Sequence, residues 1–453
     1  MEARRLWARA SSSGRGWRSD GQISEENRID REAKRVRAMR ARLHVHPKQP
    51  LIWAELARSQ LILGSDEGAI RSMKCAIQLA PENVYLRRCA SRMYLHVDEI
   101  DAALSVIRRH PSGRQDPRLV AAEIAISSVA GKPSKYAHLA KALVDEDRFR
   151  AQHRSEVAAA IGTVELENGK HKKARDFFEK SLRKPTENAL AQVQWASERD
   201  SKIVIPENAW STPCSHEADA MASRVRHDWD GVVESCELWL ESEPFASKPA
   251  ELGSFSAFRI DQAERAYRIA TSGLATNHSN ILLLNNRAVS SVYLGKIEDG
   301  IKDVEKAIRF GGSDDTHLVA TLGLIAYRLG MPSLGERYYG TAVAKFVKDK
   351  NAESTLLACL YWIREIGRYN AEYARNDLKY VKKYANKLLI GRRDPEIESM
   401  MEVIEKEIEQ ELIMGPVPDE NDTQRIESIF EHFSVGRDFM SIRAGILGEM
   451  IGS

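Results

Sequence analysis

Small residues recur along this chain at intervals of about 34 residues, and this spacing limits the possible folds more than any other feature. Val232, Ala266 and Gly300 follow one another in steps of 34, and Gly335 stands 35 residues further on. Between these positions the apolar residues follow helical periodicity, and small side chains allow two helices to cross closely. Each period therefore predicts two amphipathic helices joined by a tight turn.

One unit shows the complete pattern, because Trp53 and Met73 are large while the residues that mark helix crossings are small. Gly64 marks a turn between two helices, Pro81 ends the second helix, and Ala57, Ala69 and Ala76 lie at the expected crossings. In these residues the chain resembles the tetratricopeptide repeat family, whose helix–turn–helix unit has about 34 residues, small residues at fixed positions and a proline near its end.

The resemblance covers roughly residues 30–345 in about eight units, of which those from Ala220 to Ala342 keep register best. Cys89, Ile124 and Ser254 replace better consensus residues, so their units are degenerate. The resemblance implies an all-α, right-handed superhelical solenoid of two arrays with extra C-terminal helices. A generic helical bundle is the alternative.

Changes in composition divide the chain further. Residues 1–23 form an Arg- and Ser-rich arm that we expect to be disordered, with an organellar transit peptide as the minority interpretation. The first array spans 24–199, and its helix Glu187–Arg199 is expected to cap it. Residues 200–213 contain two prolines and predict a hinge or an ordered crossing loop. The second array with its extending helices spans 214–393, and an acidic amphipathic helix with a C-terminal tail spans 394–453. The C-terminal helices are expected at Ala352–Arg368, Ala371–Leu389, Pro395–Met414 and around Thr423–Phe433.

Signatures of catalysis and cofactor binding are missing from the sequence. It has no Walker A loop, no G-x-S-x-G and no H-E-x-x-H, and its five cysteines form no C-x-x-C. Cys214, His216 and Asp219 cluster, but a cysteine near a helix N-terminus is favoured over a metal site. We therefore expect a non-enzymatic, cytoplasmic protein without metal, cofactor or membrane-spanning segment.

Charge is unevenly distributed although the net charge is only +2. Residues 344–393 hold 12 basic and 5 acidic residues, whereas 394–431 hold 13 acidic and 2 basic ones. The basic helix could contact phosphate or an acidic partner through Lys379, Lys382, Lys383, Lys387, Arg392 and Arg393. Its tyrosines, Tyr369, Tyr373, Tyr380 and Tyr384, could stack on bases, but packing on a neighbouring helix is favoured. The acidic helix could instead neutralise the basic one.

The family resemblance also implies that the first helices of the units line a concave groove. In the second array the positions that face this groove include aromatic and arginine side chains, which dominate protein interfaces. The candidate partner-binding residues are Phe255, Phe258, Arg259, Asn285, Tyr293, Tyr327 and Arg328. Glu251 and Phe255 stand where a carboxylate clamp for chaperone tails needs lysine and asparagine, so that ligand is not expected. The chain's own helix Pro395–Met414 could alternatively fill the groove.

These features together predict a scaffold that binds another protein or a peptide in the groove of the second array. One alternative is a nucleic-acid-associated factor that uses the basic arm and the basic C-terminal helix. Another is a regulatory subunit that sequesters an enzyme. The sequence indicates neither the identity of the partner nor the oligomeric state.

Overall fold

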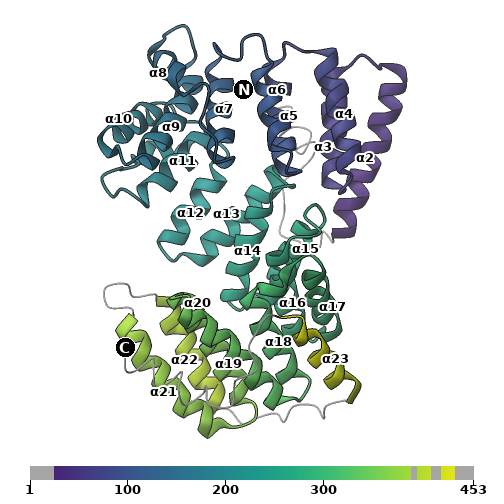
Figure 1. Cartoon of the computed structure of the whole chain (residues 1–453), viewed down its shortest axis with the longest axis vertical. Helices are drawn as coiled ribbons and strands as arrows, with labels where there is room; N and C mark the ends of the chain where they lie inside the picture. The colour runs from purple at the N-terminus through teal and green to yellow at the C-terminus, as the bar shows by residue number, and fades with distance from the viewer. Residues whose placement is uncertain (1–24, 389–394, 410–419, 434–453) are drawn as a thin grey trace. The chain divides into compact units, whose positions relative to one another are not determined.

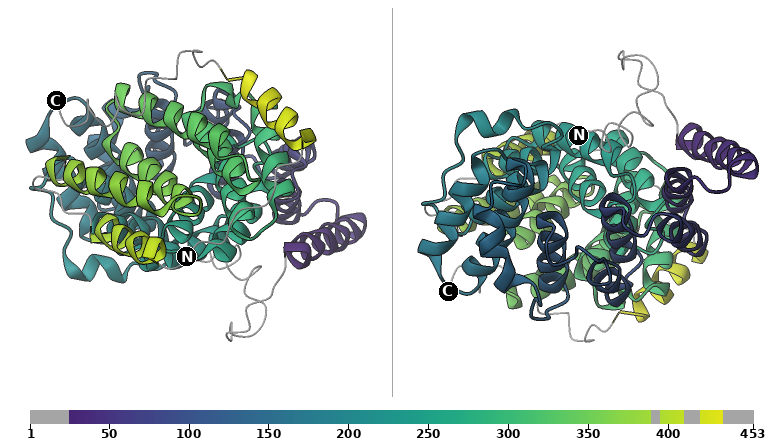
Figure 2. Two further views of the ribbon diagram at one scale, coloured as in Figure 1. Left: turned by 90° about the horizontal axis from the view of Figure 1, so that it is seen from below. Right: turned by 90° about the horizontal axis from the view of Figure 1, so that it is seen from above.

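The computed structural model describes residues 25–388, 395–409 and 420–433, and every regular element in these ranges is helical. The predicted arm, together with Arg392 and Arg393, lies outside the described residues. Successive helices pair in antiparallel fashion, as Figures 1 and 2 show. The first eleven helices are α2 (Glu25–Val45), α3 (Pro50–Ile62), α4 (Asp66–Leu79), α5 (Val84–His96), α6 (Ile100–Arg108), α7 (Pro117–Val129), α8 (Ala137–Asp145), α9 (Ala151–Glu167), α10 (His171–Leu182), α11 (Glu187–Ser197) and α12 (His216–Val225).

The later helices continue this pattern with two short 3-10 turns, η1 (Glu207–Ser211) and η2 (Gly312–Asp314). They are α13 (Trp229–Ser242), α14 (Ser247–Arg259), α15 (Ala263–Leu274), α16 (Ile281–Tyr293), α17 (Ile297–Arg309), α18 (Thr316–Arg328), α19 (Pro332–Lys348), α20 (Ala352–Gly367), α21 (Ala371–Leu388), α22 (Pro395–Glu409) and α23 (Glu420–Glu431). The predicted helix Pro395–Met414 is described only to Glu409.

The turn inside most of the described helical pairs has one recurring geometry, which the turn between α20 and α21 does not share. In this geometry the central residue has a positive φ and ends the first helix, as at Gly295, where φ is 75°. The amide of Gly295 donates to the carbonyl of Val292, and that of Lys296 donates to the carbonyl of Ser291 over 2.8 Å. These two bonds close the helix end in a Schellman motif. The same positive φ recurs at Gly64, Asp98, Gly131, Gly169, His227, Asp261, Gly295 and Gly330.

Small residues lie where the paired helices cross, as the spacing predicts. Ala57, Ala69 and Ala76 are fully buried in the first pair. A Cβ atom added to Gly162 would lie 2.8 Å from the ring of Phe178 on the partner helix. The repeat register read from the sequence is therefore confirmed by both the turns and the crossings, and the fold is a TPR-like stack of helical pairs.

The chain divides into two compact units, and the division lies within α14. The first unit contains Met1–Gly253 with Ala275–His278, and the second contains Ser254–Leu274 with Ser279–Ser453. The predicted linker 200–213 therefore lies inside the first unit as an ordered crossing loop. Its residues Ile203 and Ala209 are buried in one apolar cluster with Leu190 of α11 and Ala218 of α12. The expectation that α11 ends a stack without a following partner is thus wrong, because the loop brings α12 onto the same core.

The degenerate unit formed by α7 and α8 is held together by a buried carboxylate. Glu123 of α7 is fully buried and accepts a hydrogen bond from Arg108 Nε over 2.9 Å. It also accepts bonds from the Ser134 hydroxyl and from the amides of Lys135 and Tyr136 in the loop before α8. A fully bonded buried carboxylate can fix a loop that lacks the usual repeat sequence.

Helix α23 lies against the second helices of the second unit. Arg425 pairs with Glu298 and Glu305 of α17 at distances of 2.9 and 2.8 Å. Phe430 stacks on Tyr338 of α19 with ring centroids 4.2 Å apart. Ile426 is fully buried, so apolar burial and ion pairs both fix this helix to the repeats.

Candidate functional site

The first helices of the second unit, α14, α16, α18 and α20, face one another, and we call their facing sides the inner face. Thr321 of α18 donates a 2.7 Å hydrogen bond to Asn285 of α16. Arg259 near the end of α14 pairs with Glu353 at the start of α20 over 2.9 Å. The inner face therefore curves far enough for its outermost first helices to touch.

An aromatic cluster closes the inner face where α14, α16 and α20 converge. The ring of Phe258 packs edge-on against Tyr293, with centroids 4.9 Å apart, and lies 5.5 Å from the ring of Tyr361. The guanidinium groups of Arg328 and Arg364 lie 4.8 and 5.5 Å from the centre of the Tyr293 ring. Burial raises the pKa of the Tyr293 hydroxyl to about 12, which keeps it neutral.

Acidic side chains of the same unit pair with the arginines of this cluster. Arg328 makes two hydrogen bonds, of 2.7 and 2.8 Å, to the fully buried carboxylate of Glu365. Arg364 binds Glu407 of α22 through a 2.7 Å bond from Nε and reaches Asp261 at 3.3 Å. These arginines are therefore committed to contacts between the repeats.

The alternative that Pro395–Met414 fills the groove does not hold for its described part, Pro395–Glu409, because α20 itself closes the inner face against α14 and α18. Helix α22 packs against α20 and α21. Tyr327 of α18 is 3% exposed, and its hydroxyl accepts a hydrogen bond from Trp362 Nε1 of α20 over 3.0 Å. The reason is that α20 and α21 continue the stack as one more helical pair, so its first helix covers the ends of α14, α16 and α18.

The candidate partner-binding residues therefore fall into two groups. Phe255 is 37% exposed, whereas Phe258 and Tyr293 are half-buried in the aromatic cluster. The second group is buried by contacts within the unit. Arg259, Asn285 and Tyr327 are buried, and Arg328, which pairs with Glu365, is half-buried. Leu282 of α16 is 41% exposed. Its position in the repeat is one that the family resemblance assigns to the groove, although it is not among the candidate partner-binding residues.

The basic helix α21 is only partly accessible for an anionic partner. Lys379 and Lys383 are exposed, whereas Lys382 pairs with Glu405 of α22 over 2.7 Å. The side chain of Lys387 lies outside the described residues. The expectation that the tyrosines pack on a neighbouring helix holds for Tyr369, whose hydroxyl donates to the Tyr327 carbonyl. Tyr373 and Tyr380 are 53% and 48% exposed, so about half of each residue faces solvent.

The described residues are expected from the sequence to hold no metal site, and their cysteines, histidines and carboxylates are arranged as follows. Within it no group of His, Cys, Asp and Glu could hold a metal ion, and the five cysteines are free. The Ser215 hydroxyl donates to Asp219 over 2.8 Å at the start of α12, so this carboxylate is bonded within its own helix turn. None of the described helices is long and apolar enough to cross a membrane.

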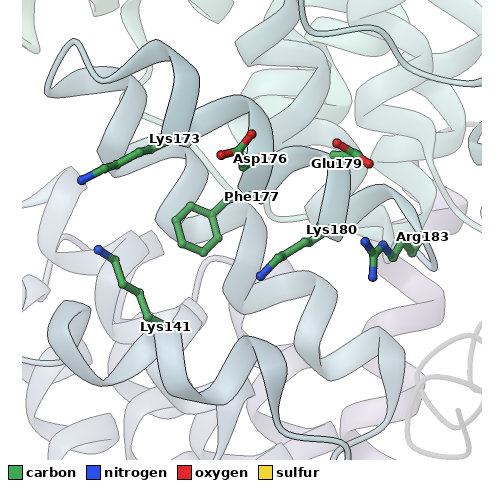
Figure 3. A pocket seen from close by; sticks show the side chains of 7 residues that line it. All are labelled: Lys141, Lys173, Asp176, Phe177, Glu179, Lys180 and Arg183. Atoms are coloured by element: carbon green, nitrogen blue, oxygen red, sulfur yellow. The ribbon is translucent and has the colours of Figure 1, made fainter.

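A pocket on the first unit was missed from the sequence. It has a volume of about 460 Å³ and lies between α8 and α10, the second helices of two neighbouring pairs (Figure 3). Lysines from both helices line it around the ring of Phe177. The basic sequence of α10 could have indicated a cationic surface. The pocket itself could not be predicted, because Lys141 on its other wall comes from another repeat.

No family model and no curated protein matches this chain. Among solved structures it is similar to yeast Tom70, at 10% identity and a TM-score of 0.29, with 85% of this chain and 94% of that one covered. It is also similar to the TPR domain of P58(IPK), at 13% identity and a TM-score of 0.26, with 89% and 98% covered. The recurring turn and the small-residue crossings described above show that this chain folds as a TPR-like stack of helix–turn–helix repeats.

Proposed function

We propose that this chain is a non-catalytic scaffold whose second unit binds a segment of a partner protein on the exposed part of the inner face. The observation that carries the proposal is the exposure of Phe255 and Leu282, two large apolar side chains on neighbouring first helices. Large apolar side chains that a rigid surface holds in place supply much of the energy of protein interfaces.

The aromatic cluster gives this binding surface its rigidity. Phe258, Tyr293 and Tyr361 pack beside the exposed residues, and the ion pair between Arg328 and Glu365 fixes α18 to α20. A preformed surface binds more tightly because less conformational entropy is lost on association. In this proposal Phe258, Arg259, Tyr293, Tyr327 and Arg328 support the surface, whereas Phe255 and Leu282 touch the partner.

The contact of Phe258 with Tyr361 also limits the ligand. A peptide that runs the full length of the first helices would have to pass where α20 already lies. The bound segment is therefore short and inserts apolar side chains beside Phe255 and Leu282. A short segment suits a loop or a chain terminus of a partner protein.

The test is affinity capture from native lysate with Phe255→Glu and Leu282→Glu variants. Phe310→Glu is the matched control, because Phe310 lies in the same unit on the loop after α17 and is 41% exposed. We expect a partner that the unaltered protein and the control retain and that both inner-face variants lose, by at least about 2 kcal/mol in a direct titration. If all variants retained the partner equally and had unchanged melting curves, the inner face would not be the binding surface.

A second candidate function is association with single-stranded nucleic acid through α21. The observation in its favour is that Tyr373 and Tyr380 are about half exposed on a helix that also exposes Lys379 and Lys383. Exposed rings interleaved with lysines can stack on bases while the lysines contact phosphates. Binding of an oligothymidylate that weakens steeply with salt and is lost in Tyr373→Ala with Tyr380→Ala would support this function.

A further inference from the structure

The pocket between α8 and α10 is lined by an unusual concentration of cations around one aromatic ring. Lys141 comes from α8, and Lys173 and Lys180 come from α10. Figure 3 shows the ends of Lys141 and Lys173 on one side of the Phe177 ring and Lys180 on the other. The ammonium group of Lys180 lies 5.8 Å from the centre of that ring.

The cations are only partly neutralised within the protein. Lys180 pairs with Asp145 over 2.7 Å, and Lys141 approaches Glu165 only to 3.7 Å. Lys173 and Arg183 make no ion pair with any of the described residues, and both are exposed. Like charges gathered in a hollow raise the local potential and attract an anionic group.

Two carboxylates on the pocket wall restrict which anion fits. Asp176 and Glu179 of α10 also line the pocket, and Figure 3 shows Glu179 on the side away from Lys141 and Lys173. A nucleic acid carries a charge at every phosphate and would meet these carboxylates along its path. A peptide carries its charges at separate side chains, so one carboxylate can lie between Lys141 and Lys173 while its neighbours avoid Asp176 and Glu179.

We propose that this pocket binds an acidic segment of a partner protein, with an Asp or Glu side chain between Lys141 and Lys173 and an adjacent apolar side chain on Phe177. Phe177 is half-buried, and part of its ring packs on the apolar cluster that α8 and α9 share. The ring is therefore held in place before a ligand arrives. This surface belongs to the first unit and to second helices, so it is independent of the inner face of the second unit.

The experiment measures fluorescence anisotropy of a labelled peptide with four glutamates around one leucine, titrated with the full chain at low salt. The variant is Lys141→Gln with Lys173→Gln. The control is Lys172→Gln, which removes one positive charge from α10 at an exposed residue that does not line the pocket. Two further probes are the same peptide with glutamines in place of the glutamates and a single-stranded oligothymidylate.

We expect the double variant to weaken binding of the acidic peptide by roughly five- to tenfold, as two partly exposed charge pairs would. Lys172→Gln should change the affinity by much less, and the glutamine peptide should not bind. Lack of binding by the acidic peptide, or equal losses in the double variant and the control, would overturn the proposal. Tighter binding of the oligothymidylate than of the acidic peptide would also overturn it and would assign the pocket to nucleic acid.

Discussion

Gly323 of α18 offers a sharp test of the packing between paired helices. A Cβ atom at this position would lie 2.6 Å from Tyr339 Cδ2 and 3.0 Å from its Cγ. The Tyr339 ring is 3% exposed and stacks on Trp362, so it has little room to move. Overpacking of this kind costs about 1–3 kcal/mol, while replacing glycine within a helix by alanine gains up to about 1 kcal/mol. We therefore expect Gly323→Ala to lower the free energy of unfolding by roughly 0–2 kcal/mol.

Gly340 of α19 is the matched control, because the nearest atom to an added Cβ there is Trp362 Cη2 at 3.7 Å. Gly340→Ala should raise the free energy of unfolding by about 0.5–1 kcal/mol, because alanine is favoured over glycine within a helix and meets no clash here. Thermal unfolding followed by circular dichroism should thus place the melting temperature of Gly340→Ala above that of Gly323→Ala, by roughly 2–4 °C per kcal/mol for a unit of this size. Shifts of the same sign and size would show that the crossing of α18 and α19 is not packed as described.

Three other predictions concern buried charge, pH and the aromatic cluster. Glu123→Ala should destabilise the first unit by about 3–5 kcal/mol in urea unfolding, because it leaves Arg108 and the loop amides without their acceptor. Although burial acts to raise the pKa of Glu298, the hydrogen bond from Arg425 lowers it below the ordinary value of 4.5. The ion pair therefore stabilises α23 at neutral pH and is lost as the pH falls below about 4.5. The protection factors of the α23 amides, which correct for slower intrinsic exchange at low pH, should fall over that range. The fall should be smaller in Arg425→Gln, which lacks the ion pairs to Glu298 and Glu305. Tyr327→Ala should lower the unfolding free energy by about 3–5 kcal/mol, because it leaves a cavity and removes the acceptor of Trp362 Nε1. Differential scanning calorimetry should show this loss as a lower melting temperature in the absence of any partner.

The repeat architecture could be predicted from the sequence because its determinants are local. Gly64 and Ala69 belong to one helical pair, and their spacing is set by the turn between two adjacent helices. The same pattern also located α20 and α21 as helices. A degenerate unit also keeps its fold. Ile124 is buried within it at a position where the repeat usually has a small residue.

The closure of the inner face could not be predicted, because it depends on residues far apart in the chain. Arg259 and Glu353 are 94 residues apart, and their pairing follows from small rotations added over several helical pairs. The same holds for the pocket on the first unit, where Lys141 and Lys173 come from different repeats. Two of the predicted binding residues, Tyr327 and Arg328, instead pack against the next repeat. The sequence cannot distinguish a side chain that contacts the next repeat from one that contacts a ligand, because both occupy the same position in the repeat.

The recurring turn has a consequence for how the stack opens. At Asp98, His227 and Asp261 the left-handed conformation is adopted by a residue with a Cβ atom, which costs about 1–2 kcal/mol more than glycine. In a linear array each repeat is stabilised mainly by its neighbours, so a local deficit stays local. We therefore expect transient fraying to begin at these three hairpins, whereas the glycine hairpins at 64, 131, 169, 295 and 330 should remain closed longer. The positions of the weak hairpins divide the stack into segments that can open in turn without loss of the whole fold.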